Sequence, residues 1–148
     1  MKPSPFMEAA FAEAEAAAAR GEVPIGAVVV SGGEILARAG NRTRELNDPT
    51  AHAEMLAIRA ACLALGSERL TDADLYVTLE PCPMCAAAIS FARIRRLYFG
   101  AVDEKGGAVV SGARLYAQPT CHHAPETYAG ISERRAAEML KSFFRDRR

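Results

Sequence analysis

Apolar side chains recur every three or four positions in four stretches of the chain, and this spacing is typical of helices that bury one face. The pattern predicts helices over residues 5–20, 51–65 and 83–94, and a last one from about 132 onward. In the second helix the apolar positions are Met55, Ile58, Cys62 and Leu65. Gly66 follows as its C-terminal stop, since glycine accepts the left-handed conformation that closes a helix.

Short runs of β-branched and aromatic residues lie between these helices. The segment IGAVVVSGGEILARAG, residues 25–40, predicts two strands joined by a Gly-Gly turn. Two further runs, at 74–79 and 96–101, are separated by a helix, so at least part of the sheet is expected to be parallel. Residues 41–50 predict a loop, and residues 103–130 a long loop with one short helix. We therefore expect a single α/β domain over residues 1–148, with a sheet covered by helices.

Composition and charge narrow the class of protein only slightly. Half of the 148 residues are hydrophobic, and 18 Lys and Arg balance 18 Asp and Glu, as in ordinary globular domains. No run is long enough to cross a bilayer and the N-terminal segment does not resemble a secretory leader, so a cytoplasmic location is expected. Basic residues gather at 93–96 and in the last fifteen residues. Such a patch either binds phosphate groups or is a solvated helix face.

The segment AHAEM, residues 51–55, places His52 and Glu54 two positions apart in an alanine-rich helix. Residues two apart on a helix do not face one another. Either His52 is an ordinary core residue and Glu54 is solvated, or both reach toward something held between this helix and another element.

A second cluster of reactive side chains, in LEPCPMC, follows the strand at 74–79. Cys82 and Cys85 share a face of the helix that begins near Pro83, and a helix N-terminus favours thiolates. Alone, such a pair is a redox pair, half of a structural zinc site or two small core residues.

Combining the two clusters gives a more specific pattern. Cys62 is assigned to packing, which leaves His52, Cys82 and Cys85 as three ligands with an open position, the pattern of catalytic zinc. Glu54 would then lie beside that position, where a carboxylate can accept and return a proton.

TAHAEM together with LEPCPMC resembles the zinc-dependent cytidine deaminase superfamily, whose signature is His-x-Glu followed by Pro-Cys-x-x-Cys. The resemblance is greatest to bacterial tRNA wobble adenosine deaminases and covers nearly the whole chain, including VPIGAVVV, GNRTRELNDPTAHAEM, RIRRLYFGAVDEKGGA and FFRDRR. It implies a three-layer α-β-α fold with a central mixed five-stranded sheet, a homodimer and one Zn²⁺ per subunit.

The same resemblance implies the roles of the reactive residues. His52, Cys82 and Cys85 would bind the zinc, and Glu54 would be the general acid/base. The reaction would convert adenosine to inosine at the first anticodon position of a tRNA, by family resemblance the arginine tRNA.

The resemblance also implies contacts with the anticodon stem-loop. Asn41 would touch the flipped nucleotide, although asparagine is also a common turn residue. Asp103 and Lys105 would meet the substrate strand, or else form an exposed loop pair. Phe144 and Arg145 would meet neighbouring nucleotides, and one of the two adjacent phenylalanines must then pack in the core.

The segment QPTCHHAPETYAG, residues 118–130, departs from the best-known members of the family by its adjacent Cys121, His122 and His123. Contiguous residues rarely converge on one ion, so we expect a polar loop ordered by hydrogen bonds rather than a second metal site.

Two other functions remain open at this point. A free-base deaminase acting on guanine or cytosine would share the zinc chemistry and leave the basic, aromatic C-terminus as surface. A non-catalytic zinc-stabilised module would need a fourth protein ligand, such as Cys121, and would not need Glu54.

Overall fold

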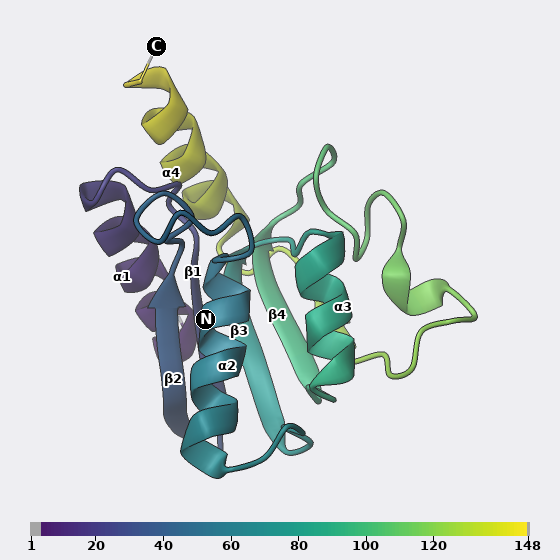
Figure 1. Ribbon diagram of the computed structural model, residues 1–148. Helices are drawn as coiled ribbons and strands as arrows, with labels where there is room; N and C mark the ends of the chain where they lie inside the picture. The colour runs from purple at the N-terminus through teal and green to yellow at the C-terminus, as the bar shows by residue number, and fades with distance from the viewer. Residues whose placement is uncertain (1–3, 148) are drawn as a thin grey trace.

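In the computed structural model, which describes residues 4–147, a five-stranded sheet lies between two layers of helices (Figure 1). Its strands are β1 (Gly26–Ser31), β2 (Glu34–Gly40), β3 (Ala73–Leu79), β4 (Arg96–Ala101) and β5 (Glu126–Tyr128). Their order is β2-β1-β3-β4-β5. β1 is antiparallel to β2 and β3, whereas β3, β4 and β5 are parallel. The mixed five-stranded sheet is therefore confirmed.

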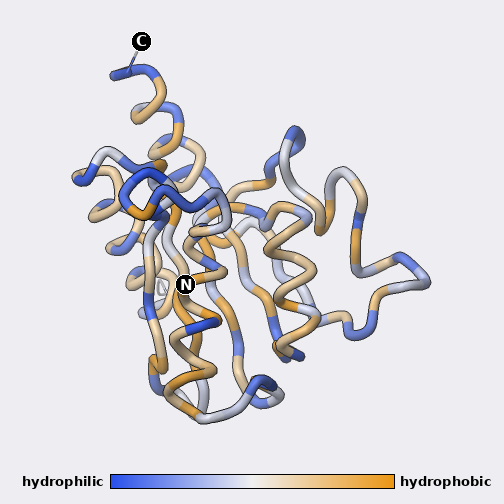
Figure 2. Tube along the Cα trace, in the orientation of Figure 1, coloured by the Kyte–Doolittle hydropathy of each residue, from blue (hydrophilic) through white to orange (hydrophobic). Residues whose placement is uncertain are grey.

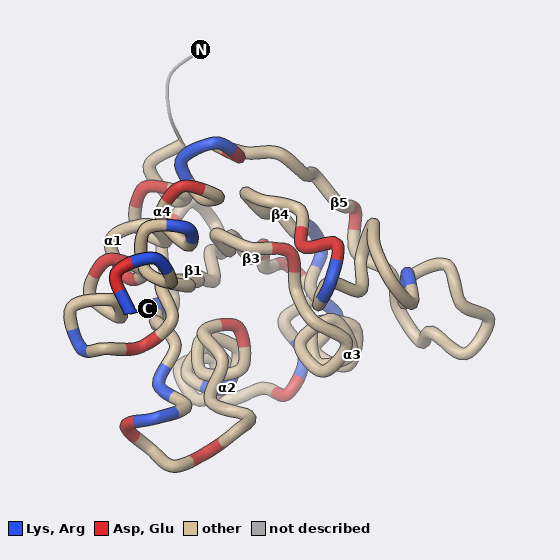
Figure 3. The backbone as a smooth tube through the Cα atoms, turned by 90° about the horizontal axis from the view of Figure 1, so that it is seen from above, with Lys and Arg blue, Asp and Glu red and all other residues tan. Residues whose placement is uncertain are grey.

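Two helices cover each face of the sheet, as Figure 3 shows most clearly. One face carries α1 (Pro5–Ala19) and α4 (Glu133–Arg145), and the other carries α2 (Ala53–Leu65) and α3 (Pro83–Phe91). Apolar residues follow the central strands, while polar residues gather on the connecting loops (Figure 2). None of the helices within residues 4–147 has the length and hydropathy needed to span a membrane.

Local sequence signals account for several of these elements. The Ser4 hydroxyl accepts a hydrogen bond from the Met7 N–H at 3.3 Å and caps α1. Gly32 and Gly33 have φ values of 59° and 79°, as a tight hairpin turn requires. A Cβ atom on Gly26 would lie 1.9 Å from the Ala10 carbonyl oxygen, so glycine lets α1 pack directly against β1.

Helix boundaries and one core position differ from the sequence-based prediction. α2 begins at Ala53, because His52 has an extended backbone and forms the N-cap. α3 ends at Phe91, because the chain soon turns through a left-handed conformation at Arg93. Leu65 was expected in the core but is half exposed, since α2 faces the sheet with small residues and Ile58.

The edge strand β5 was not predicted from the local pattern, which indicated a loop throughout residues 103–130. All three residues of β5 are exposed, so no buried run marks it in the sequence. It is held by parallel pairing with β4 and by the Tyr128 ring, which stacks on Tyr98 at 4.9 Å between centroids. Long-range partners therefore define this strand.

The carboxyl ends of β3 and β4 and the amino ends of α2 and α3 meet at one edge of the sheet, uppermost in Figure 1. The loop between β2 and α2 lies at the same edge, since it leads into the amino end of α2, and the Arg42 N–H closes it by donating to the Ala51 carbonyl at 3.0 Å. This edge contains most of the reactive side chains identified in the sequence.

Candidate active site

His52, Cys82 and Cys85 come together where α2 and α3 begin. His52 is the N-cap of α2 and Cys82 the N-cap of α3, while Cys85 lies in the first turn of α3. The His52 Nδ1 atom is 3.6 Å from the Cys82 sulfur and 3.4 Å from the Cys85 sulfur. Within residues 4–147, this is the group of His, Cys, Asp and Glu side chains that could hold a metal ion.

The spacing of these donor atoms fits Zn²⁺. Atoms bound tetrahedrally to zinc at about 2.0–2.3 Å lie roughly 3.5 Å apart, close to the observed separations from His52 to each cysteine. One imidazole nitrogen and two thiolates form a donor set that zinc prefers. Three protein ligands leave a fourth position for water or substrate.

The surroundings of the two cysteines prepare a thiolate. A hydrogen bond from the Cys85 thiol lowers the pKa of Cys82 to about 4, with further help from His52 and the Cys85 backbone N–H. The same hydrogen bond, together with burial, raises the pKa of Cys85. Hydrogen bonding to Cys82 raises the pKa of His52 against the effect of burial. Metal binding requires deprotonated ligands, and Cys82 already meets that requirement.

Glu54 lies beside this group and is only 4% exposed, which excludes the interpretation that it is solvated. Burial raises the pKa of Glu54, and the nearby His52 partly opposes that effect. Because His52 precedes the helix, the two side chains escape the geometry that separates residues two apart within a helix. A buried carboxyl group with a raised pKa can carry a proton near neutral pH.

The remaining cysteines and histidines have other partners. Cys62 is half-buried and packs against the core, as expected. The Cys121 sulfur lies 3.6 Å from the Ser90 hydroxyl, so it is not the fourth ligand of a structural zinc site.

The two histidines that follow Cys121 also separate from one another. His122 lies against the Phe91 ring, and His123 Nε2 donates to the Ile94 carbonyl at 2.7 Å. These hydrogen bonds order the loop, as expected.

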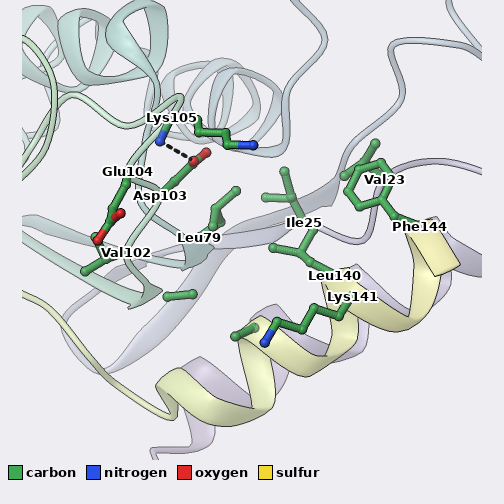
Figure 4. A pocket seen from close by; sticks show the side chains of 12 residues that line it. Val23, Ile25, Leu79, Val102, Asp103, Glu104, Lys105, Leu140, Lys141 and Phe144 are labelled. Carbon is green, nitrogen blue, oxygen red and sulfur yellow. Dashed lines mark hydrogen bonds between the residues drawn. The ribbon is translucent and has the colours of Figure 1, made fainter.

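A groove of about 800 Å³ opens at the same edge of the sheet (Figure 4). Asp103 and Lys105 line one side, and Phe144 lines the other from α4, with Leu79 and Ile25 between them. Phe144 is 50% exposed whereas the adjacent phenylalanine is buried, as the sequence required of one of the two. The structure thus brings together three of the five residues expected to contact RNA.

The other two expected contact residues are not among those that line this groove. Asn41 is buried, and its side-chain amide donates to the Thr43 hydroxyl at 3.3 Å, so it orders its own turn. Arg145 is exposed and donates to the Ser142 hydroxyl at 3.2 Å.

Two buried carboxylates were not identified from the sequence. Glu22 and Glu80 are each 2% exposed, and both bind backbone N–H groups of loops at this edge. Glu80 stands within LEPCPMC, but the local sequence does not show the role of either glutamate, because their partners lie more than twenty residues away.

Comparison with known families places this fold and site in one class. Residues 1–101 match the family described as the cytidine and deoxycytidylate deaminase zinc-binding region. The chain belongs to the cytidine and deoxycytidylate deaminase family, and its His52, Cys82 and Cys85 form the zinc-binding group of that family.

Individual relatives are similar over nearly the whole chain. A tRNA-specific adenosine deaminase of Agrobacterium fabrum is 68% identical over 143 residues, covering 97% of this chain and 94% of the relative. The tRNA-specific adenosine deaminase of Bacillus subtilis is 48% identical, and the match covers 97% of this chain and 89% of the relative.

Solved structures give a similar result. A structure from a study of A-to-I editing by tRNA:A34 deaminases is 69% identical with a TM-score of 0.90, covering 91% of this chain and 98% of that one. A guanine deaminase of Bacillus subtilis is 43% identical with a TM-score of 0.66, and the match covers 69% of this chain and 66% of that one.

Proposed function

We propose that this protein is a zinc-dependent tRNA adenosine deaminase that converts the wobble adenosine, A34, to inosine. The observation that carries the proposal is a buried carboxyl group, Glu54, beside a three-ligand metal centre. The similarity to tRNA-specific adenosine deaminases over nearly the whole chain supports the choice of substrate. Residues 1–148 would act as one catalytic domain, in the cytoplasm where tRNA is used.

His52, Cys82 and Cys85 would hold Zn²⁺, which when bound polarises water and lowers its pKa. In the proposed reaction, water adds at C6 of adenine and ammonia leaves, so the base becomes hypoxanthine. Glu54 would take the first proton of the attacking water and deliver it to ring N1, and would then take the proton of the new C6 hydroxyl and deliver it to the departing amine. Its burial keeps the proton from exchanging freely with solvent.

The groove would hold the anticodon nucleotides beside the reacting base. Phe144 offers an exposed ring on which a splayed base can stack. Lys105 supplies a positive charge to the RNA backbone, and Asp103 can accept hydrogen bonds from base edges. Asn41 would contact the flipped nucleotide, and Arg145 would contact a neighbouring phosphate.

The arginine tRNA whose anticodon begins with adenosine is the proposed substrate. Stem-loops that all begin with adenosine but differ at the next two anticodon positions would test this choice. We expect the arginine stem-loop to give the highest kcat/KM, and equal values for all stem-loops would contradict the assignment.

The proposed assembly is a homodimer formed through α2 and α3. Leu63 on α2 is 84% exposed and Phe91 at the end of α3 is 64% exposed. A groove of about 450 Å³ between these helices is lined in part by Ile58, Cys62 and Ala88. A second copy of the chain would cover this apolar surface.

A free-base deaminase is the second candidate, favoured by the similarity to the Bacillus subtilis guanine deaminase. The two candidates are distinguished by assaying an anticodon stem-loop beside free adenosine, cytidine, guanine and cytosine. We expect inosine in the stem-loop and no turnover of the free compounds. Turnover of a free base with an unchanged stem-loop would overturn the tRNA assignment and leave the metal centre unaffected.

A further inference from the structure

A loop that lines the groove closes around a buried carboxylate that takes no part in the proposed chemistry. This carboxylate belongs to Glu80, the residue after β3, and is 2% exposed. Its Oε1 atom accepts hydrogen bonds from the Asp103 N–H at 2.9 Å and the Ser111 hydroxyl at 3.0 Å. Its Oε2 atom accepts from three consecutive N–H groups, those of Val109, Val110 and Ser111, at 2.9–3.0 Å.

These hydrogen bonds fix both ends of the loop 103–111. Burial by itself raises the pKa of Glu80, but the hydrogen bonds to Asp103, Val109 and Ser111 outweigh burial and hold the pKa below its usual value. Hydrogen bonds to an ionised group are stronger than neutral ones, and five donors satisfy this carboxylate without a basic side chain.

The loop fits closely over the carboxylate. A Cβ atom on Gly107 would lie 2.4 Å from the Glu80 carboxyl carbon, so the backbone can pass there only as glycine. The Ala108 N–H also donates to the Pro81 carbonyl at 2.9 Å. The loop is therefore bound to the two residues that directly precede the zinc ligand Cys82.

The tip of the same loop carries the side chains that line the groove. The Asp103 carboxylate accepts hydrogen bonds from the Lys105 N–H at 3.2 Å and the Gly106 N–H at 3.0 Å, which shapes the turn. The backbone of Asp103 is held in turn by Glu80. A change at Glu80 is therefore transmitted to the groove through hydrogen bonds.

We propose that Glu80 is a positioning residue that holds Asp103 and Lys105 at a set distance from the zinc ligand Cys82, and so keeps the groove in the shape that binds the RNA. This inference rests on the proposed tRNA function. Glu22 has a matching arrangement, since its carboxylate accepts hydrogen bonds from the N–H groups of Arg44 and Glu45 in the loop between β2 and α2.

The test is steady-state kinetics on the anticodon stem-loop with Glu80→Gln, whose amide nitrogen cannot accept hydrogen bonds. We expect KM to rise roughly tenfold, with kcat and zinc content retained. Asp74→Asn is the matched control, because Asp74 is a carboxylate on β3 whose partner among residues 4–147 is the exposed Arg95. It should leave KM unchanged.

Two further variants reach the same loop without altering the carboxylate. Gly107→Ala should displace the loop from Glu80 and raise KM similarly, and Ser111→Ala should do so more weakly. Combining Glu80→Gln with Gly107→Ala should raise KM no further than either alone, because both release the same loop. If Glu80→Gln fails to fold, the KM values of Gly107→Ala and Ser111→Ala test the proposal in its place.

Hydrogen exchange on the free enzyme provides a readout that does not depend on activity. Amides 109–111 should exchange faster in Glu80→Gln than in the wild type. Unchanged KM in Glu80→Gln and Gly107→Ala, in an enzyme that edits the stem-loop, would overturn this inference alone. A fall in kcat and zinc content at constant KM would do the same, by assigning Glu80 to the metal centre. A wild-type protein inactive on the stem-loop would overturn the proposed function.

Discussion

Where α2 begins decides what His52 and Glu54 can do. His52 has φ −74° and ψ 153°, an extended conformation, and Glu54 is only the second helical residue. A helix begun one residue earlier would have directed the two side chains to different faces. In the observed fold, the His52 imidazole lies close to the Cys82 and Cys85 sulfurs, and the Glu54 carboxyl group is buried beside them.

Glu54→Gln should abolish turnover while zinc remains bound. Glutamine keeps the size of the side chain but cannot carry the proton, so we expect kcat to fall by at least about 100-fold. Inosine formation and metal content measured on the same preparation would check this. Glu13→Gln, on α1 and paired with Arg38, is the control; retained activity in Glu54→Gln would refute the assigned role.

The pattern of ligand residues could be predicted from the sequence because its members are defined by residue type and short spacing. His52 and Glu54 are two apart and Cys82 and Cys85 three apart. Glu80 stands in LEPCPMC, but the sequence does not reveal its role, because the backbone N–H groups that it binds lie 23 to 31 residues away.

At the scale of the elements, α4 divides its two phenylalanines between the core and the groove. Phe143 is buried and carries the Arg147 guanidinium over its ring at 3.9 Å. Phe144 lines the groove opposite the loop that carries Asp103. One turn of helix thus supports both stability and the proposed RNA contact.

Phe144→Ala should raise KM for the stem-loop and leave the thermal midpoint nearly unchanged. Loss of a base-stacking ring typically costs about 1–3 kcal/mol of binding. Phe143→Ala should instead lower the midpoint, because truncating a buried phenylalanine costs about 3–5 kcal/mol of stability. The opposite result, destabilisation by Phe144→Ala with KM unchanged, would place Phe144 in the core and remove it from the RNA site.

Elements with a strong local pattern were predicted well, and those defined by distant partners were not. The hairpin follows from its β-branched runs and two glycines, and β4 from its apolar run at 96–101. β5 exists because Tyr128 pairs and stacks with Tyr98. The exposure of Leu65 depends on alanines facing the sheet, which hydrophobicity alone does not distinguish from a leucine stripe.

For the whole molecule, α2 and α3 carry large apolar side chains on their exposed surfaces. Leu63 on α2 and Phe91 at the end of α3 are both largely exposed. Surfaces of this kind usually mark contacts between protein chains. The homodimer implied by the family resemblance would bury them.

The double substitution Leu63→Glu with Phe91→Glu should convert a dimer to a monomer. Two buried, unpaired carboxylates would oppose association strongly. Light scattering coupled to size-exclusion chromatography would measure the mass in solution. Ile35→Glu, on the edge strand β2, should leave a dimer intact; a wild-type protein of monomer mass would refute the proposed assembly.

The central claim is that the enzyme hydrolytically deaminates one adenosine, at the wobble position of an anticodon loop. The most direct measurement is mass spectrometry of an anticodon stem-loop after incubation with the enzyme in ¹⁸O-labelled water. The account predicts inosine at the wobble position with one heavy oxygen at C6, formed by the wild type and not by Glu54→Gln. An unchanged stem-loop, beside free guanine that gains the label in the same tube, would contradict it.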